Sequence, residues 1–249
     1  MKHQKTKSIG IIPARFQSSR FPGKPLQLIE GKAMIIRVIE QCLKSTLNNV
    51  IVATDDDRIA EVVIKNGYEV LLTPSHLQSG TERCFYAYQN LEKPSDYLIN
   101  IQGDEPFIAP SQINQTIALL EHKETQIATL FTHFKSEEDV KSPHKVKLVC
   151  DENGKALLFS RSVIPNPQKG FEISNYKKHI GIYGFKTEVI SKINQLKPHP
   201  FEEAESLEQL RWLMNGFQIY TAFSSEVSLG IDTPEDLKAA EDYLKRLGE

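Results

Sequence analysis

The hydrophobic pattern in the first half of the chain alternates between short apolar runs and helical spacing. Residues 9–13 form a β-branched run that predicts a buried strand, and residues 33–46 carry apolar side chains at helical spacing. Asp55 or Asp56 is placed to cap a following helix, which Gly67 would end. The further predicted strands are 50–54, 68–73, 97–102 and 127–132, and the further helices are 81–91 and 111–122. Repeated strand–helix–strand units predict an α/β fold with a mostly parallel sheet covered on both faces.

From about residue 135 the pattern changes to strands that follow one another directly. The predicted strands are 145–150, 156–159 and 179–185, and a turn with Asn153 and Gly154 separates the first two. This order favours antiparallel pairing. Helical periodicity returns at 203–214 and 233–247. Because we find no repeat and no low-complexity linker, we predict a single domain over residues 1–249 with an embedded antiparallel subdomain at about 135–225.

Composition narrows the classes of function. The chain has 249 residues, and 30 Lys and Arg oppose 32 Asp and Glu for a net charge of −2, which argues against a nucleic-acid partner. No apolar run approaches the roughly 20 residues of a membrane helix, and the run at 9–12 is too short for a signal peptide, so no membrane insertion is expected. Three cysteines without a CxxC motif indicate reduced thiols in a cytoplasmic protein.

The loop that follows the first predicted strand is rich in cations. Residues 13–25 contain Arg15, Arg20 and Lys24, together with two serines and Gly23. Guanidinium groups and a lysine suit the oxygens of a triphosphate. The loop also lies at the carboxyl end of a predicted strand, which is where sheets of this kind bind ligands. The loop is neither a Walker A loop, since Pro25 follows Lys24, nor a GxGxxG loop. A solvated basic loop is the alternative interpretation.

Two carboxylates are candidate magnesium ligands. Asp104 follows Gly103 at the end of a predicted strand and could bind Mg²⁺ together with substrate oxygens, although a turn closed by proline explains it equally well. Asp232 precedes a helix start in which Thr233 is the expected N-cap and Asp236 the capping-box acid. That cap leaves Asp232 without a structural role, which makes it the better ligand candidate.

Two other polar clusters allow a second interpretation. The acids at 55–57 could bind a metal, but helix capping and a favourable first-turn charge explain them adequately. Residues 79–83 open a helix with hydroxyls and backbone N–H groups, which could contact a base or ribose or could simply cap the helix.

Taken together, these segments closely resemble the 3-deoxy-manno-octulosonate cytidylyltransferase (CMP-Kdo synthetase) family. The matching segments, in family order from about residue 11 to 237, are IIPARFQSSRFPGKPL, VIVATDD, SGTER, INIQGDEP, FSRSVIP, HIGIYGF, LEQLR and GIDTPEDL. CMP-sialic acid synthetases are similar in the first loop only. The chain departs from the family at His76 and Leu77, where an acid and a histidine are usual.

The resemblance implies a Rossmann-like nucleotidyltransferase fold, a mixed, mostly parallel sheet with an inserted antiparallel subdomain for sugar binding and dimerisation. It also implies a homodimer that uses Mg²⁺. The implied reaction joins CTP and Kdo to give CMP-Kdo and pyrophosphate, which activates Kdo for lipopolysaccharide biosynthesis in the cytoplasm.

The resemblance also implies roles for individual residues. Arg15, Ser18, Arg20 and Lys24 would hold the triphosphate, and Ser79, Gly80 and Thr81 would lie near the nucleotide. Asp104 and Asp232 would bind Mg²⁺, and these two with Arg15 and Lys24 form the expected catalytic set. Gln102, Arg161, His179, Tyr183, Glu208 and Gln209 would contact the sugar acid.

Three other classes stay open at this stage. A sugar-nucleotide glycosyltransferase of similar topology would not release pyrophosphate from CTP and a free sugar. A catalytically silent protein would bind CTP without turnover. An NAD-dependent oxidoreductase is disfavoured by the missing GxGxxG motif. Within the favoured class, the sugar acid could be Kdo, an amino-substituted analogue, or another nonulosonic or octulosonic acid.

Overall fold

The computed structural model describes residues 6–17, 21–92, 94–226, 230–231 and 233–247. The chain divides into two compact units, one formed by Met1–Asn114 with Val227–Glu249 and the other by Gln115–Glu226. The single domain with a subdomain at about 135–225 stays a prediction.

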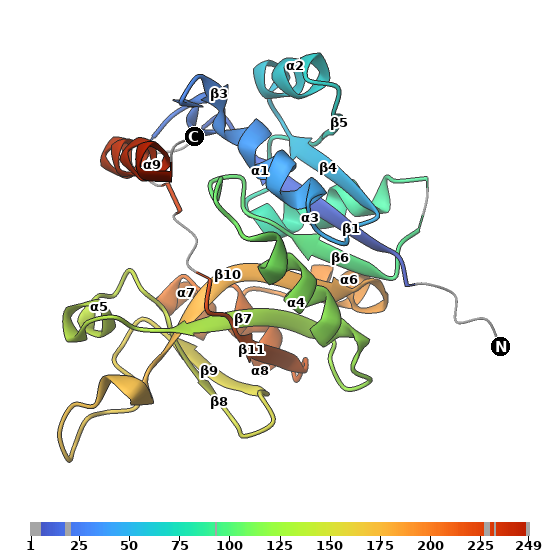
Figure 1. The fold of residues 1–249 in the computed structure, drawn as a ribbon. Helices are drawn as coiled ribbons and strands as arrows, with labels where there is room; N and C mark the ends of the chain where they lie inside the picture. The colour runs from blue at the N-terminus through green and yellow to red at the C-terminus, as the bar shows by residue number, and fades with distance from the viewer. Residues whose placement is uncertain (1–5, 18–20, 93, 227–229, 232, 248–249) are drawn as a thin grey trace. The chain divides into compact units, whose positions relative to one another are not determined.

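The first unit contains a parallel four-stranded sheet. Its strands are β1 (Ser8–Ala14), β4 (Asn49–Thr54), β5 (Glu69–Leu72) and β6 (Tyr97–Asn100), in the order β6-β1-β4-β5 (Figure 1). Helices α1 (Met34–Leu43), α2 (Asp57–Lys65) and α3 (Gly80–Gln89) pack against these strands. The unit also holds η1 (Lys24–Leu26), the β2 (Leu28–Ile29) and β3 (Lys32–Ala33) hairpin, and α9 (Pro234–Leu247). Helix α4 (Pro110–Glu121) continues the chain into the second unit. The predicted parallel part of the fold is confirmed.

Side-chain caps set where two of these helices begin. Asp56 is the N-cap of α2, and its carboxylate accepts a hydrogen bond from the backbone N–H of Arg58 at 3.1 Å. At α9 the predicted capping box is present: Thr233 Oγ1 accepts from the N–H of Asp236 at 3.2 Å, and the Asp236 carboxylate accepts from the N–H of Thr233 at 2.9 Å. These bonds satisfy N–H groups that have no partner within the helix. The capping interpretation of Asp56 and Thr233 is confirmed.

The second unit carries the predicted antiparallel strands. Strand β10 (Lys177–Lys186) pairs antiparallel with β7 (Ile127–His133) and β8 (Lys147–Cys150), and β8 forms a hairpin with β9 (Ala156–Ser160). Strand β11 (Ile219–Phe223) runs parallel to β7 on its other side (Figure 1). The helices of this unit are α5 (Glu137–Lys141), α6 (Thr187–Asn194), α7 (Pro200–Glu205), α8 (Gln209–Met214) and the turn η2 (Ile173–Asn175).

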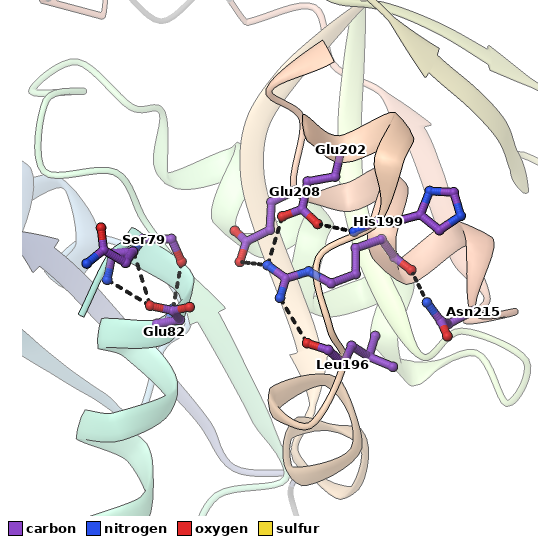
Figure 2. A network of polar contacts seen from close by, with 9 residues as sticks. Ser79, Glu82, Leu196, His199, Glu202, Glu208 and Asn215 are labelled. Atoms are coloured by element: carbon purple, nitrogen blue, oxygen red, sulfur yellow. Dashed lines mark hydrogen bonds and ion pairs between the residues drawn. The ribbon is translucent and has the colours of Figure 1, made fainter. Parts of the chain in front are cut away.

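The predicted helical segment at 203–214 is confirmed in part, because it is helical at both ends but interrupted at 206–208. The chain forms α7 and α8 instead, because Ser206 takes the left-handed conformation with φ 50° and ψ 50° and ends α7. Arg211 of α8 connects the two short helices through Glu202, whose carboxylate lies 2.8 Å from its guanidinium (Figure 2). Apolar spacing continues across the break, and spacing alone does not report a single residue of different backbone conformation.

Strand β11 and helices α5 and α6 are not predicted by the hydrophobic pattern. The residues of β11 alternate between buried and less buried positions, and the strand is supported by its pairing with β7. That pairing joins segments about ninety residues apart, so local sequence carries little of it.

The cysteines and the helices bear on two of the sequence predictions. Cys42 and Cys84 are buried and Cys150 is partly buried, and all three are free thiols. In the described part of the chain, no helix combines the length and apolar character needed to cross a membrane.

Candidate functional site

A pocket of about 290 Å³ lies in the first unit, beside the segments that follow β1 and β6. It brings together six of the sequence-predicted residues, which come from three separate segments: Arg15, Lys24, Ser79, Gly80, Gln102 and Asp104. It is also lined by Pro13, Ala14, Pro25, Leu77, Gln78, Arg83 and Gly103. Its place at the carboxyl ends of parallel strands is where such sheets bind ligands.

Two glycines allow these segments to approach one another. A Cβ at Gly103 would lie 2.8 Å from the carbonyl oxygen of Pro13, so a larger residue would push the loop after β6 away from β1. A Cβ at Gly80 would lie 3.2 Å from the ring of Pro13. The close packing on Pro13 therefore holds the 79–80 and 102–104 segments at one wall of the pocket.

The pocket carries a mixed set of charges. Lys24 Nζ lies 2.5 Å from Asp104 Oδ2, and their side chains are 12% and 33% exposed. Arg83 is buried and forms an ion pair with Asp55 at 3.1 Å, so its charge is already neutralised. Arg15 is exposed and has no ion-pair partner among the residues that the structure describes. A phosphate ligand would meet Arg15 and Lys24 as its nearest cations.

Ser79 and Thr81 have structural partners. Ser79 caps α3, since its Oγ accepts from the backbone N–H of Glu82 at 3.1 Å, and the Glu82 carboxylate accepts from the N–H of Gln78 at 2.8 Å (Figure 2). Thr81 is buried, and its hydroxyl accepts from the Asn100 amide at 3.3 Å. The capping interpretation of Ser79 is confirmed, whereas Thr81 does not line the pocket.

Several predicted positions are placed differently or not described. Ser18, Arg20 and Asp232 lie outside the described residues. At the two positions that depart from the family, Leu77 lines the pocket and His76 is exposed outside the lining.

The donor set suits a magnesium ion that is shared with a substrate. Asp104 offers a carboxylate at the pocket wall, and Mg²⁺ is commonly bound by one or two carboxylates with phosphate oxygens and waters completing the shell. Among the described residues, no cluster of three or more His, Cys, Asp or Glu side chains could hold a metal by itself. Asp104 therefore fits such a shared site, and a protein-only metal cage is not formed by these residues.

A larger cavity of about 520 Å³ lies at the opposite, amino ends of the strands. It is lined by Lys7, Asn48, Asn49, Glu69 and Glu92, among others. One lysine beside two glutamates is a poor match for a polyphosphate. The smaller pocket, with Arg15 and Lys24, is the better nucleotide candidate on charge as well as on position.

The predicted sugar-acid residues other than Gln102 lie in the second unit. His179 and Tyr183 stand on β10 with ring centroids 5.3 Å apart, and Tyr183 also contacts the Trp212 ring edge-on at 5.2 Å. The Tyr183 hydroxyl is buried and has no hydrogen-bond partner among the described residues. Burial lowers the pKa of His179 to about 3, and burial followed by the charge of Glu208 raises the pKa of Tyr183. Both rings are therefore neutral near pH 7.

Arg161 and the start of α8 are tied to the protein itself. The Arg161 guanidinium donates to three backbone carbonyls, those of Glu205 at 2.6 Å, Pro143 at 2.9 Å and Ser206 at 3.3 Å. The Glu208 carboxylate, labelled in Figure 2, forms an ion pair with Arg211 at 3.6 Å, and Gln209 is buried. These contacts give Arg161 a structural task that the motif alone does not indicate.

Two buried charged residues received no role from the sequence, namely Arg83 and Lys147. Arg83 lies within the SGTER segment, and its pairing with Asp55 depends on the tertiary fold. Lys147 is fully buried, and its ammonium donates to the carbonyls of Ser142, Lys145 and Arg161 at 3.0, 2.9 and 2.5 Å. In the sequence, the sign of a buried lysine was its position within the predicted strand at 145–150.

Comparison with known proteins places this geometry in a family. Residues 9–221 match the family model described as cytidylyltransferase. The 3-deoxy-manno-octulosonate cytidylyltransferase of Cytophaga hutchinsonii is 47% identical over 237 residues, which cover 92% of this chain and 94% of that protein. The protein of the same name from Parabacteroides distasonis is 45% identical, over 96% of this chain and 98% of its own length.

A solved structure extends the match to three dimensions. A CMP:2-keto-3-deoxy-manno-octonic acid synthetase complexed with CTP is 36% identical, with a TM-score of 0.91 over 97% of this chain and 100% of that chain. The Rossmann-like nucleotidyltransferase fold that the sequence resemblance implied is thereby confirmed. Because the family model spans most of the chain and the relatives match nearly all of it, the chain belongs to the cytidylyltransferase family and, within it, to the 3-deoxy-manno-octulosonate cytidylyltransferases.

Proposed function

We propose that this enzyme transfers CMP from CTP to Kdo and releases pyrophosphate. Family membership supports the reaction, and the solved relative that carries CTP supports the nucleotide. The observation that carries the proposal in this chain is the pocket at the carboxyl ends of β1 and β6, where Arg15, Lys24 and Asp104 come together. A triphosphate needs such a set of cations beside an acid that can share a metal.

In the proposed mechanism the pocket positions and neutralises the triphosphate. Arg15 and Lys24, joined by Ser18 and Arg20, bind the phosphate oxygens by charge-assisted hydrogen bonds. A hydroxyl of the sugar acid attacks the α-phosphate in line with the departing pyrophosphate, and Lys24 offsets the charge that develops on the leaving group. Positioning and charge neutralisation supply most of the acceleration in such transfers.

We assign the magnesium ion to Asp104 and Asp232. When bound, Mg²⁺ would supply positive charge at the phosphates and lower the pKa of the attacking hydroxyl. In the protein alone, Lys24 neutralises the Asp104 carboxylate. Lys24 is therefore placed to transfer its contact from Asp104 to a phosphate oxygen as the ligands enter.

The remaining assignments follow the family resemblance. Ser79, Gly80 and Thr81 are assigned to the nucleotide. Thr81 would contribute by supporting the start of α3. Gln102, Arg161, His179, Tyr183, Glu208 and Gln209 belong to the sugar acid. We also propose a homodimer in the cytoplasm that serves lipopolysaccharide biosynthesis. The free state of all three cysteines supports the location.

Pyrophosphate release over a matrix of substrates tests the proposal. CTP, UTP, ATP and GTP are each combined with Kdo, an amino-substituted Kdo analogue or sialic acid, with Mg²⁺ and with EDTA. We expect release with CTP and Kdo that depends on Mg²⁺ and clearly exceeds release with sialic acid. Equal or faster turnover of sialic acid would overturn the assignment of the sugar. Absence of pyrophosphate with every sugar acid would favour a glycosyltransferase or a silent CTP-binding protein.

A further inference from the structure

Thr129 of β7 is fully buried, and its hydroxyl touches three groups of β10. Thr129 Oγ1 lies 2.8 Å from the carbonyl oxygen of Ile182, 3.1 Å from that of Ile180 and 3.0 Å from Nε2 of His179. The two carbonyls lie in the stretch where β10 shifts its register against β7, between Ile180 and Tyr183. This irregular stretch leaves two carbonyls beside a single hydroxyl.

The count of hydrogen-bond donors around Thr129 Oγ1 bears on which nitrogen of His179 is protonated. A threonine hydroxyl has one proton to donate, and carbonyl oxygens can only accept. If this proton pointed at Nε2 of His179, the hydroxyl oxygen would face both carbonyl oxygens, at 2.8 and 3.1 Å, with no hydrogen between them. The proton of Thr129 therefore goes to a carbonyl, with Ile182 the nearer. The oxygen then presents a lone pair to Nε2 of His179, and an unprotonated Nε2 would set two lone pairs against each other at 3.0 Å. This arrangement of acceptors favours a hydrogen on Nε2.

The other ring nitrogen is then an acceptor. A neutral imidazole has one donor and one acceptor nitrogen, so Nδ1 of His179 is unprotonated. The ring is neutral at physiological pH because burial holds its pKa near 3. Among the described residues, Nδ1 has no hydrogen-bond partner, and the ring's other neighbours are the aromatic faces and edges of Phe159 and Tyr183. The Tyr183 hydroxyl is also buried, and its contact with the Thr129 side chain partly opposes the rise of its pKa.

We infer that Thr129 is a positioning residue that holds His179 in the Nε2–H tautomer, so that Nδ1 accepts a hydrogen bond from a hydroxyl of the sugar acid. The ligand part of this inference rests on the proposed function, and the tautomer part does not. Thr129 acts through His179 and needs no contact with the substrate.

The tautomer is tested in the protein without substrate by ¹⁵N NMR of labelled histidine. In the wild type we expect Nε2 to give a protonated, pyrrole-type resonance and Nδ1 an unprotonated, pyridine-type one. Thr129→Ser keeps the hydroxyl and should keep this pattern, whereas Thr129→Val removes it and should give a mixture of tautomers. A protonated Nδ1 in the wild type, or an unchanged pattern in Thr129→Val, would overturn the tautomer assignment.

Thr221→Val is the matched control for loss of a buried hydroxyl. Thr221 is buried in the same unit on β11, and its hydroxyl donates to the Gly154 carbonyl at 3.0 Å without touching a histidine. We expect Thr221→Val to lower the melting temperature as Thr129→Val does, while the His179 resonances stay unchanged. If Thr221→Val altered the tautomer equally, the effect would be one of general stability and the inference would fail.

The acceptor role is tested by adding Kdo. We expect Kdo to shift the Nδ1 resonance in the wild type and in Thr129→Ser. For Thr129→Val we expect KM for Kdo to rise about 2- to 10-fold, the range of one net hydrogen bond, with KM for CTP within about 2-fold. An Nδ1 resonance that does not respond to Kdo in an enzyme that turns it over would overturn the acceptor role. Absence of turnover in the wild type would instead count against the proposed function and leave the tautomer result standing.

Discussion

The carboxylate of Asp104 is paired with Lys24 in the protein alone, yet the proposed reaction assigns it to a cation. A metal ligand and a residue of a salt bridge respond differently to loss of charge. As a partly exposed ion pair, the contact between Lys24 and Asp104 contributes about 1 kcal/mol or less to folding. As a ligand of Mg²⁺, the same carboxylate would support the transition state directly.

Asp104→Asn and Asp232→Asn should each lower kcat by about 100-fold or more, because a hard cation prefers charged oxygen ligands. CTP affinity should fall much less, since Arg15 and Lys24 still bind the phosphates. The double variant should be little slower than either single variant, because ligands of one ion act as a unit. Steady-state rates over a Mg²⁺ series and CTP titration calorimetry provide the measurements. Asp57→Asn, at an exposed acid of α2, is the control for charge alone. Near-normal turnover of Asp232→Asn at limiting Mg²⁺ would return Asp232 to a helix-flanking role.

His179 should make the free energy of unfolding depend on pH below neutrality. Its pKa falls from the ordinary 6.5 to about 3 on folding, because burial disfavours the charged ring. Between these values the unfolded chain binds a proton that the folded protein excludes, so the free energy of unfolding decreases as pH falls through this window. The slope contributed by one such group is at most about 1.4 kcal/mol per pH unit.

Urea unfolding of the wild type and His179→Gln between about pH 4.5 and 6.5 measures this slope. The variant should lose less stability on acidification than the wild type. Asp56 and Asp139 also have pKa values lowered by their hydrogen bonds to Arg58 and Lys145, but from 3.8, so most of their stabilisation is lost below the measured range of about pH 4.5 to 6.5. Parallel slopes for the wild type and His179→Gln would contradict the burial of a neutral ring.

At the scale of elements, the break between α7 and α8 rests on one backbone conformation. Ser206 is exposed and left-handed, at φ 50°, and its carbonyl accepts from the Arg161 guanidinium. The break places Glu208 and Gln209 at the start of a new helix rather than within a long one. The arrangement of these two predicted sugar-acid residues therefore depends on a position that no apolar pattern marks.

Ser206→Gly should raise the free energy of unfolding by up to about 1 kcal/mol, because glycine adopts positive φ without a Cβ penalty. Ser206→Val should lower it by about 1 kcal/mol or more, because a β-branched residue is strained there. Chemical denaturation of both variants is the measurement. Gly216→Ala calibrates the scale, since Gly216 has φ 81° and open space around its Cα. Equal stability of the glycine and valine variants at 206 would show that the conformation is not the origin of the break.

At the scale of the whole molecule, two cavities compete for the nucleotide within the first unit. The pocket after β1 and β6 holds the cations, and the larger cavity lies at the amino ends of the same sheet. Volume favours the cavity at the amino ends as the nucleotide site, whereas charge favours the pocket after β1 and β6. We expect charge to prevail, because a triphosphate binds chiefly through its anionic oxygens.

Hydrogen exchange with and without CTP should resolve the two cavities. CTP should slow exchange at the backbone amides of 13–17, 77–83 and 102–104, and should leave 48–49 and 91–92 at the other end of the sheet unchanged. CTP should also raise the melting temperature, with a stabilisation of about 2.7 kcal/mol at a free concentration of 100 Kd. Protection confined to the amino-end segments would place the nucleotide in the larger cavity.

The sequence by itself determined the local and periodic features of this protein. Apolar runs and helical spacing predicted the parallel strands of the first unit, and the turn with Asn153 and Gly154 predicted the β8–β9 hairpin. The Thr233 cap and the motifs that carry the family were likewise readable, because each depends on residues within a few positions of one another. Several residues that line the pocket after β1 and β6 could be named for the same reason, since their segments follow strands.

Only the tertiary structure decided the features that depend on distant pairs. The contact of Lys24 with Asp104, the burial of Arg83 against Asp55 and the three contacts of the Thr129 hydroxyl all join separate segments. The pairing of β11 with β7 and the left-handed Ser206 also escaped the pattern. Hydrophobic periodicity reports which face of an element is buried, but the partner of a buried polar group is set by packing between elements.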